Sequence, residues 1–417
     1  MAELIKIILW IAYFVSLYFA IFWFMVLLED KPKKRARELK KLPFVSIIIP
    51  AFNEGKRIRP TIGSVLKLNY PKNKYELLII NDGSTDNTSK VTKEIINNNK
   101  GFNIRLIEQK NKGKGAALNN ALRQSKGEFF VCLDADSYVT KDALHKLLPE
   151  FADENVASVL PLLKVRKPKN VLQKMQWLEY LVNIFYKELM GKLDCIHVAP
   201  GPFSIYRKSI LEEVGGFDEN NLTEDLEISL RLQQHNYRII QLLNADVYTI
   251  APSSFKELSK QRNRWYKGSL INAFKYRKMM FNKDYGDFGL IQMPTIIIYG
   301  LVAIIIISAT AYYIFKPYIQ YVYNLSMIEF DIMTLIRTFS LNFHYLDLNY
   351  MTLLLMLIMV GIALTIIRKS MIRTNEKKAT KYGVFSFLSY LILYFFVLGL
   401  IWIRVAFDLL RGKKQRW

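Results

Sequence analysis

Two carboxylates stand two residues apart at the end of an apolar run, in the segment Asp134-Ala-Asp136. Hard divalent cations prefer oxygen ligands, and Mg²⁺ commonly binds through one or two carboxylates together with substrate phosphates. A metal ion held by Asp134 and Asp136 would neutralise the charge on a departing nucleoside diphosphate. A solvated turn has the same short pattern, so this motif alone leaves both interpretations open.

A second motif, Lys112-Gly-Lys-Gly115, precedes a predicted helix. Glycine allows the backbone to approach a ligand closely, and a helix N-terminus favours anions. Lys114 could therefore reach a phosphate. The spacing differs from that of a Walker A motif, and a basic turn without a ligand is the alternative.

The segment Thr223-Glu-Asp225 opens a predicted helix over 225–234. Thr223 is expected at the N-cap, and the helix dipole is expected to keep a nearby carboxylate ionised. An attacking hydroxyl needs a base to take its proton, and Asp225 is the candidate. Simple capping and pairing with the dipole is the alternative.

A basic, aromatic motif, Gln261-Arg-Asn-Arg-Trp265, precedes a long apolar run. Arg264 could clamp a phosphate, and Trp265 offers a flat face on which a sugar ring could stack. An amphipathic helix with tryptophan at the headgroup level of a membrane is the alternative. Both interpretations can hold together.

Alternating strand and helix patterns place these motifs on a common framework. Strands are expected at 45–50, 75–80, 103–107 and 128–133, and helices near 57–68, 86–98 and 114–125. This alternation predicts a doubly wound, mostly parallel α/β sheet, in which ligands bind beyond the C-terminal ends of the strands. The polar residues fall at those ends: Asn53 and Glu54, Asp82, and Asp134 with Asp136. A further helix over 171–189 has apolar groups at a 3.6-residue period and is interpreted as structural.

The chain has 417 residues, a formal charge of +22, two cysteines and four histidines. The cysteine count excludes a disulfide scaffold and a Cys-rich zinc site, and it suits a reducing compartment. Many Lys and Arg residues flank apolar runs, as in 31–35 and 411–414. This placement favours anionic lipid headgroups over nucleic acid as the partner of the basic charge.

Four apolar runs are long enough to be membrane spans. They lie at 4–28, 289–315, 350–367 and 384–409. A cleaved signal peptide is disfavoured for the first run, because it is long and no small-residue cleavage site follows it. The basic cluster after it predicts that residue 31 onward is cytosolic. Four spans would then leave the basic C-terminal tail outside, so either the last run does not cross fully or 318–340 adds a span.

The resulting division has four parts. Residues 1–30 form an N-terminal transmembrane helix, and 31–255 a cytosolic catalytic domain. Residues 256–288 form interfacial amphipathic helices that carry the Gln261–Trp265 motif, and 289–417 a C-terminal region with about three spans. The chain is expected in the cell membrane as a multi-pass protein.

The motifs are most specific as an ordered set. The set comprises Pro50-Ala-Phe-Asn-Glu54, Asp82-Gly-Ser84, Asp134-Ala-Asp136, Gly201-Pro-Phe-Ser204, Thr223-Glu-Asp225 and Gln261-Arg-Asn-Arg-Trp265. Its order and spacing resemble glycosyltransferase family 2, which has the GT-A fold. The resemblance covers about residues 43–270 and is strongest to the membrane branch with hyaluronan, cellulose, chitin and poly-N-acetylglucosamine synthases.

The resemblance implies an inverting, metal-dependent transfer of a hexose or N-acetylhexosamine from a UDP-linked donor, with Mg²⁺ or Mn²⁺ as cofactor. The implied donor-binding residues are Asn53, Glu54, Asp82, Lys114, Asp134, Asp136 and Arg264, and the implied acceptor-binding residues are Gly201, Pro202, Glu224, Gln261 and Trp265. Asp225 would be the base. Asp136, more than Asp134, would bind the metal.

Three functions remain open at this point. The first is a processive polysaccharide synthase that moves its product through its own helices. The second is a non-processive transferase that acts on a lipid-linked acceptor. The small membrane portion, with about four spans, argues against the polymer export that the first requires. The third, from another class, is a membrane scaffold that binds a nucleotide sugar without turnover.

Overall fold

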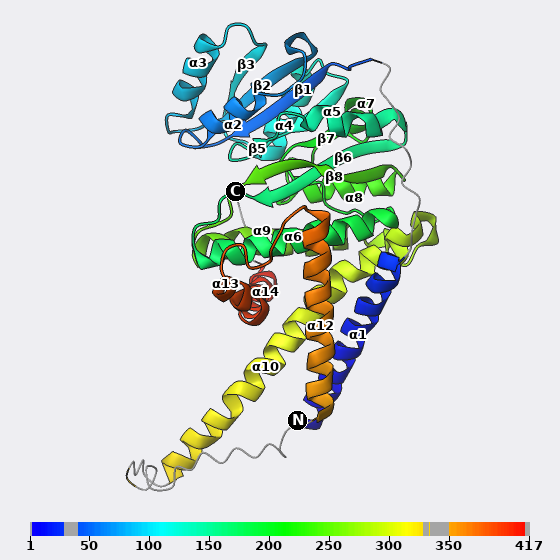
Figure 1. Cartoon of the computed structure of the whole chain (residues 1–417), viewed down its shortest axis with the longest axis vertical. Helices are drawn as coiled ribbons and strands as arrows, with labels where there is room; N and C mark the ends of the chain where they lie inside the picture. The colour runs from blue at the N-terminus through cyan, green and yellow to red at the C-terminus, as the bar shows by residue number, and fades with distance from the viewer. Residues whose placement is uncertain (1, 29–40, 328–332, 334–349, 413–417) are drawn as a thin grey trace.

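The computed structural model describes residues 2–28, 41–327, 333 and 350–412. A sheet-containing domain lies at one end of the molecule, two long helices cross beneath it, and apolar helices project away from it (Figure 1). The N-terminus lies at the far end of these projecting helices.

The centre of the domain is an eight-stranded sheet with the order β3-β2-β1-β4-β7-β6-β8-β5. The strands are β1 Val45–Ala51, β2 Tyr75–Asp82, β3 Ile104–Gln109, β4 Phe129–Cys132, β5 Tyr138–Val139, β6 Val156–Val165, β7 Ser204–Arg207 and β8 Arg238–Thr249. Strands β3, β2, β1 and β4 are parallel, as the sequence predicts. Beyond β4 the sheet is mixed, because β7 is antiparallel to both of its neighbours while β6 and β8 are parallel to each other.

Helices cover both faces of the sheet. Alternate residues of β1 point to opposite faces, so Ile47 and Ile49 belong to one core and Ile48 to the other. The first core contains α2 Ile58–Val65, α3 Thr88–Asn98 and α5 Ala143–Leu147, and the second contains α4 Lys114–Gln124, α7 Lys208–Glu213 and α8 Glu224–Gln234. The result is the doubly wound α/β architecture that the sequence predicts.

Two long helices, α6 Val171–Lys192 and α9 Phe255–Lys275, separate the sheet domain from the apolar helices. One side of α6 packs on β6, and another packs on α1 Ala2–Leu28 and α12 Tyr350–Arg373. The predicted structural role of 171–189 agrees with this position. Short turns of helix complete the chain: η1 Lys72–Lys74, η2 Leu148–Ala152, η3 Arg277–Met279, η4 Lys283–Tyr285 and the π turn η5 Phe288–Gln292.

The remaining helices are α10 Met293–Met327, α13 Val384–Ile392 and α14 Tyr394–Leu410. Within the described residues, Ile7–Leu28 and Phe288–Met327 are long and apolar enough to cross a membrane. The pair α13–α14 would count as a third such helix if it is one span, but it is bent by 42° at Leu393. The predicted span at 350–367 lies in α12, some of whose side chains are outside the described residues.

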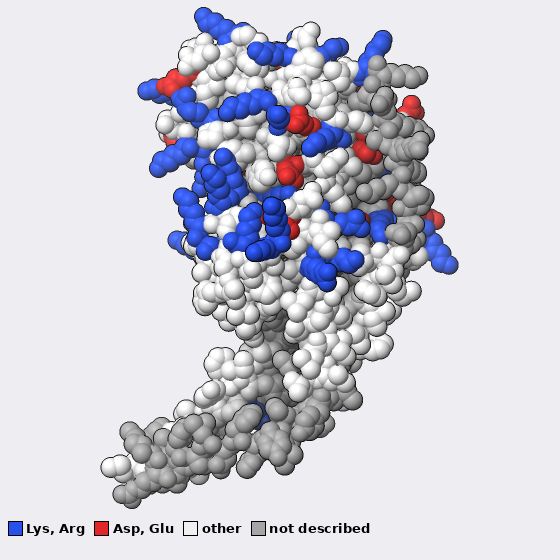
Figure 2. Space-filling view, in the orientation of Figure 1, with Lys and Arg blue, Asp and Glu red and all other residues white. Residues whose placement is uncertain are grey.

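The run 318–340, which was considered as an extra span, lies only partly within the described residues. Its first part continues α10 to Met327, and most of the rest lies outside the described residues. On the face drawn in Figure 2, Lys and Arg side chains crowd the domain, and the described part of the projecting helices carries almost none. This partition is typical of a protein whose helices project into lipid.

Candidate active site

A cavity of about 730 Å³ lies beyond the C-terminal ends of β1, β2 and β4, and side chains of α6, α8 and α9 close it. All the predicted site residues except Asn53 line it. Residues from positions 54 to 265 therefore meet in one space, as expected for ligand sites at the edge of a doubly wound sheet.

Asn53 lies beside the cavity and holds one of its loops. It has a left-handed backbone (φ 55°), which asparagine tolerates better than most residues. Its Oδ1 accepts hydrogen bonds from the backbone N–H groups of Thr85 (2.9 Å) and Asp86 (3.3 Å). Asn53 therefore shapes the loop after β2.

Asp82 shapes the loop that leads to Lys114. Its Oδ1 accepts from Gln109 Nε2 (2.7 Å) and from the backbone of Lys112 (3.0 Å), and its Oδ2 accepts from the backbone of Gly113 (2.8 Å). Gly113 has φ 91°, a conformation that glycine adopts without strain. This carboxylate fixes the turn from which α4 begins.

Lys114 lies between two acidic motifs. Its Nζ is 2.7 Å from Asp134 Oδ1 and 2.9 Å from Glu224 Oε1. Burial lowers the pKa of Lys114, but Asp134 and Glu224 outweigh this effect and hold it well above its usual value. The sequence indicated a phosphate ligand for Lys114 but not this bridge between Asp134 and Glu224.

Gly201 leaves room for this ion pair. A Cβ at Gly201 would lie 2.5 Å from Asp134 Oδ1 and 2.7 Å from Lys114 Nζ. No larger residue fits without moving the charged groups. Pro202, the next residue, also lines the cavity.

Three carboxylates, from Glu54, Asp134 and Asp136, give this part of the cavity an excess of negative charge. Burial raises the pKa of Asp136, and Asp134 adds to the increase. Burial, with smaller contributions from Asp136, Asp86 and Asp134, raises the pKa of Glu54 to about 7. A bound cation would stabilise the ionised forms of these buried carboxylates.

No group of three or more Asp, Glu, His or Cys residues is arranged as a metal cage within the described parts of the chain. A metal ion at Asp136 would therefore need ligands from a substrate as well. Such shared coordination is usual for Mg²⁺, so the carboxylate set fits a cation that arrives with phosphates.

Asp225 lies in the first turn of α8 and lines the cavity. Burial, followed by repulsion from Glu224, raises the pKa of Asp225 to about 6, against the opposing effects of Lys114 and Arg264. The sequence predicted that the helix dipole keeps this carboxylate ionised. In the structure, desolvation outweighs the favourable charges around it.

Thr223 stands at the N-cap of α8, as predicted, but its side chain does not cap the helix. Its Oγ1 instead accepts a hydrogen bond from Asn272 Nδ2 of α9 (3.1 Å). A Cβ at Gly268 would lie 2.4 Å from the same Oγ1. Thr223 thus holds α8 and α9 in close contact.

Gln261, Arg264 and Trp265 reach the cavity from α9. Trp265 is supported from behind by Arg262, whose guanidinium carbon lies 4.0 Å from the ring centroid. Arg262 is fully buried and pairs with Glu179 of α6 (2.6 Å). Tyr394, at the bend between α13 and α14, donates to the same Glu179 oxygen (2.8 Å).

The C-terminal helix α14 contacts the first half of α9. Arg404 donates to Ser259 Oγ (2.9 Å), and Asn263 donates to Asp408 (3.2 Å). The rings of Tyr266 and Trp402 stack at 4.4 Å with an angle of 7° between their planes. Sequence reasoning missed this support, because its partners are more than a hundred residues apart.

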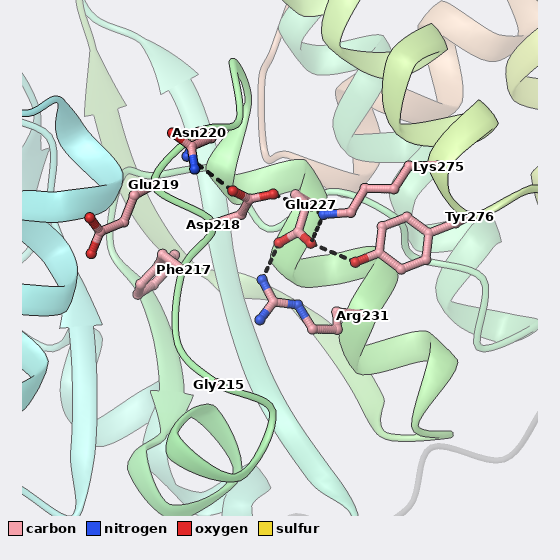
Figure 3. A pocket seen from close by; sticks show the side chains of 9 residues that line it. All are labelled: Gly215, Phe217, Asp218, Glu219, Asn220, Glu227, Arg231, Lys275 and Tyr276. Atoms are coloured by element: carbon pink, nitrogen blue, oxygen red, sulfur yellow. Dashed lines mark hydrogen bonds and ion pairs between the residues drawn. The ribbon is translucent and has the colours of Figure 1, made fainter.

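A smaller pocket of about 540 Å³ on the outer side of α8 contains a second ion-pair network (Figure 3). Glu227, 1% exposed, accepts hydrogen bonds from Arg231, Lys275 and Tyr276. Lys275 also pairs with Asp218 (2.8 Å). This network fixes α8, which carries Asp225, to the end of α9.

Comparisons with known proteins agree with this geometry. Residues 46–215 match the family model described as Glycosyl transferase family 2. Poly-beta-1,6-N-acetyl-D-glucosamine synthase from Staphylococcus epidermidis is 31% identical over 265 residues, which are 61% of this chain and 63% of the relative. The same enzyme from Staphylococcus aureus is 33% identical over 243 residues, 58% of this chain and 57% of the relative.

One solved structure matches nearly the whole chain. A mannosyltransferase from Pyrobaculum calidifontis, in complex with GDP-Man and Mn²⁺, covers 99% of this chain and 100% of its own with a TM-score of 0.64 and 19% identity. This match shows a shared fold. The chain spans about three fifths of the length of the curated relatives it matches. Through residues 46–215, this chain is similar to glycosyl transferase family 2.

Proposed function

We propose that this protein transfers a sugar from a nucleoside diphosphate donor to an acceptor hydroxyl at the cytosolic face of a membrane. The observation that carries the proposal is the single cavity lined by Lys114, Asp136, Asp225 and Trp265. It combines a cation, clustered carboxylates, a buried base and an aromatic platform. These are the parts that glycosyl transfer from a diphosphate requires.

The donor lies across the ends of β1, β2 and β4 in this proposal. Glu54 and Asp82 contact the nucleoside, and Lys114 and Arg264 contact the diphosphate. Asp136, with Asp134, would hold Mg²⁺ or Mn²⁺, and the ion would neutralise charge on the diphosphate. Lys114 then exchanges part of its pairing with Asp134 for a phosphate.

Asp225 is the base of the reaction. As the acceptor oxygen forms its bond to the anomeric carbon, the bond from that carbon to the phosphate oxygen breaks, and the nucleoside diphosphate leaves. The acceptor proton passes to the Asp225 carboxylate and later to solvent. A pKa of about 6 suits this task, because the group is ionised near neutrality and still basic.

The acceptor occupies the side of the cavity formed by Gly201, Pro202, Glu224, Gln261 and Trp265. The indole of Trp265 is held in place by Arg262 and presents a face for a sugar ring. Glu224, paired to Lys114, links the two sides. The names of the staphylococcal relatives favour an N-acetylhexosamine as the transferred sugar.

The membrane arrangement that fits best has three crossings, by α1, α10 and α12. The bent pair α13–α14 then lies against α6 and α9 on the cytosolic side, where Arg404 and Asp408 find their partners. This arrangement places the basic segment 368–381 and the C-terminal tail in the cytosol. It removes the parity conflict of four spans, and we therefore favour the prediction that the last run does not cross.

The test uses the purified full chain in lipid nanodiscs with a panel of nucleotide sugars, and it measures release of the nucleoside diphosphate. We expect turnover with UDP-N-acetylglucosamine and none for Asp225→Asn, although that variant still binds the donor. Full activity of Asp225→Asn would favour a binding scaffold instead. The length of the product on a gel separates a polymer synthase from a transferase that adds one sugar.

A further inference from the structure

One stripe of α6 faces the cavity and has no role in the reaction described above. It consists of Tyr180, Asn183, Ile184, Lys187 and Met190, at the three- and four-residue spacing of one helix face. Lys187 is its only charged member. Within the described parts of the chain, Lys187 has no ion-pair partner, whereas Lys114 has two.

Lys187 is a cation in a poorly solvated place. Burial lowers the pKa of Lys187 to about 8, although Asp225 acts in the opposite direction. Its neighbour His197 also lines the cavity, and burial together with Lys187 lowers the pKa of His197 to about 4, so its ring is neutral at pH 7. An amine in such surroundings gains from an anionic partner.

The same wall of the cavity is backed by the apolar helices. Phe185 and Leu189 of α6 pack on Trp23 and Val26 of α1. Lys192, which is roughly 7–8 Å along the helix axis from residue 187, donates to the last carbonyls of α1, those of Val26 (3.0 Å) and Leu27 (3.2 Å). Residue 187 of α6 is therefore within about two helical turns of a residue that contacts the cytosolic end of a proposed span.

The second proposed span, α10, begins near the same residues. The His197 Nδ1 lies 3.1 Å from Gln292 Nε2, within hydrogen-bond distance. Gln292 immediately precedes α10. The ends of two helices, both at the expected membrane surface, thus flank Lys187 and His197. Lipid headgroups lie at this depth.

We propose that Lys187 and His197 form an anion subsite for the phosphate of a lipid-linked sugar acceptor. The proposal rests on the proposed function and names the acceptor class for the same cavity. Lys187 binds the phosphate as a point charge, and His197 donates its ring N–H. The sugar attached to that phosphate then reaches Asp225 and Trp265 while the lipid remains among the apolar helices.

The experiment compares three acceptors with the full chain in nanodiscs, all carrying N-acetylglucosamine. One is linked to a prenyl diphosphate, one is the neutral octyl glycoside, and one is the soluble 1-phosphate. Wild type is compared with Lys187→Met, Lys187→Arg and the control Lys174→Met. Lys174 lies on the same helix but does not line the cavity.

Loss of a charged hydrogen bond should raise the acceptor KM of Lys187→Met roughly 10- to 100-fold for the prenyl diphosphate acceptor. The KM for the octyl glycoside and the slow hydrolysis of the donor without acceptor should not change. Lys187→Arg should recover most of the affinity, and Lys174→Met should behave as wild type. An equal loss with the neutral glycoside overturns the subsite, and equal use of the soluble phosphate overturns the lipid assignment.

A binding measurement separates failure of the subsite from failure of the proposed function. Thermal stabilisation of the protein by the prenyl diphosphate acceptor requires no turnover. If wild type turns over no donor but shows stabilisation that Lys187→Met abolishes, the proposed function fails and the subsite stands. Stabilisation that is unchanged in Lys187→Met overturns the subsite.

Discussion

Replacement of Asp225 by asparagine should make the protein more stable while it abolishes transfer. The pKa of Asp225 rises from 3.8 to about 6 on folding. At about 1.4 kcal/mol per pKa unit, the ionised carboxylate costs up to about 3 kcal/mol above pH 6. Partial access to solvent reduces this to roughly 1–3 kcal/mol. Asparagine has the same shape without the charge, so Tm at pH 7.5 should rise by roughly 2–10 °C.

The sign of the pH dependence provides an internal check. Because the native state binds this proton more tightly than the unfolded chain, wild type loses stability from this group as pH rises through 3.8 to 6. The difference in stability between Asp225→Asn and wild type should therefore have its full size at pH 7.5 and fall to about a third of that near pH 4.5. Thermal unfolding of the full chain, followed by intrinsic fluorescence at both pH values, measures it.

Asp218 supplies a control of the opposite sign. Burial raises the pKa of Asp218, but hydrogen bonds from Lys275 and the backbone of Asn220 outweigh this effect and keep it below its usual value. Asp218→Asn should therefore lower Tm at pH 7.5.

Transfer by Asp225→Asn should fall roughly 10²- to 10⁴-fold. A Tm for Asp225→Asn equal to or below that of wild type at pH 7.5 would refute the reasoning that burial raises this pKa.

Three further predictions concern the reaction itself. The kcat/KM should increase with pH through about 6 as Asp225 becomes ionised; initial rates between pH 5 and 8 measure it, and a flat profile contradicts the role of Asp225. Removal of divalent cations with EDTA should abolish transfer, and Mn²⁺ or Mg²⁺ should restore it. Asp136→Asn should need a higher metal concentration for the same activity, and full activity in EDTA contradicts the metal site. Gly201→Ala should raise the donor KM roughly 10- to 100-fold, because its Cβ would lie within 2.7 Å of both Asp134 oxygens and of Lys114 Nζ; donor titration tests this, and an unchanged KM contradicts it.

The sequence predicted those features that depend on local pattern. The strands β1 to β4 appear where apolar β-rich runs end in polar residues, and Glu54, Asp82 and Asp136 line one cavity because parallel strands end at one edge. The mixed half of the sheet was not predicted. The positions of β6, β7 and β8 depend on pairing between distant segments, for which a single sequence carries no periodic signal.

The charged interactions were the least predictable part of the site. The predicted ionisation of Asp225 considered only its own helix, whereas burial in the folded protein has the largest effect on its pKa. Arg262 is part of a motif that was noticed, yet its role behind Trp265 depends on Glu179 and Tyr394 from two other helices. Such networks arise from tertiary packing, which residue spacing does not encode.

The attachment of α14 to α9 has a consequence for the order in which the chain is made. Synthesis runs from the N-terminus, so the donor-binding strands and α9 leave the ribosome well before Tyr394, Arg404 and Asp408. Until those residues arrive, Glu179 and Asn263 lack their partners on α13–α14. The support of Trp265 through Arg262 and Glu179 is therefore completed only after α13–α14 has been made.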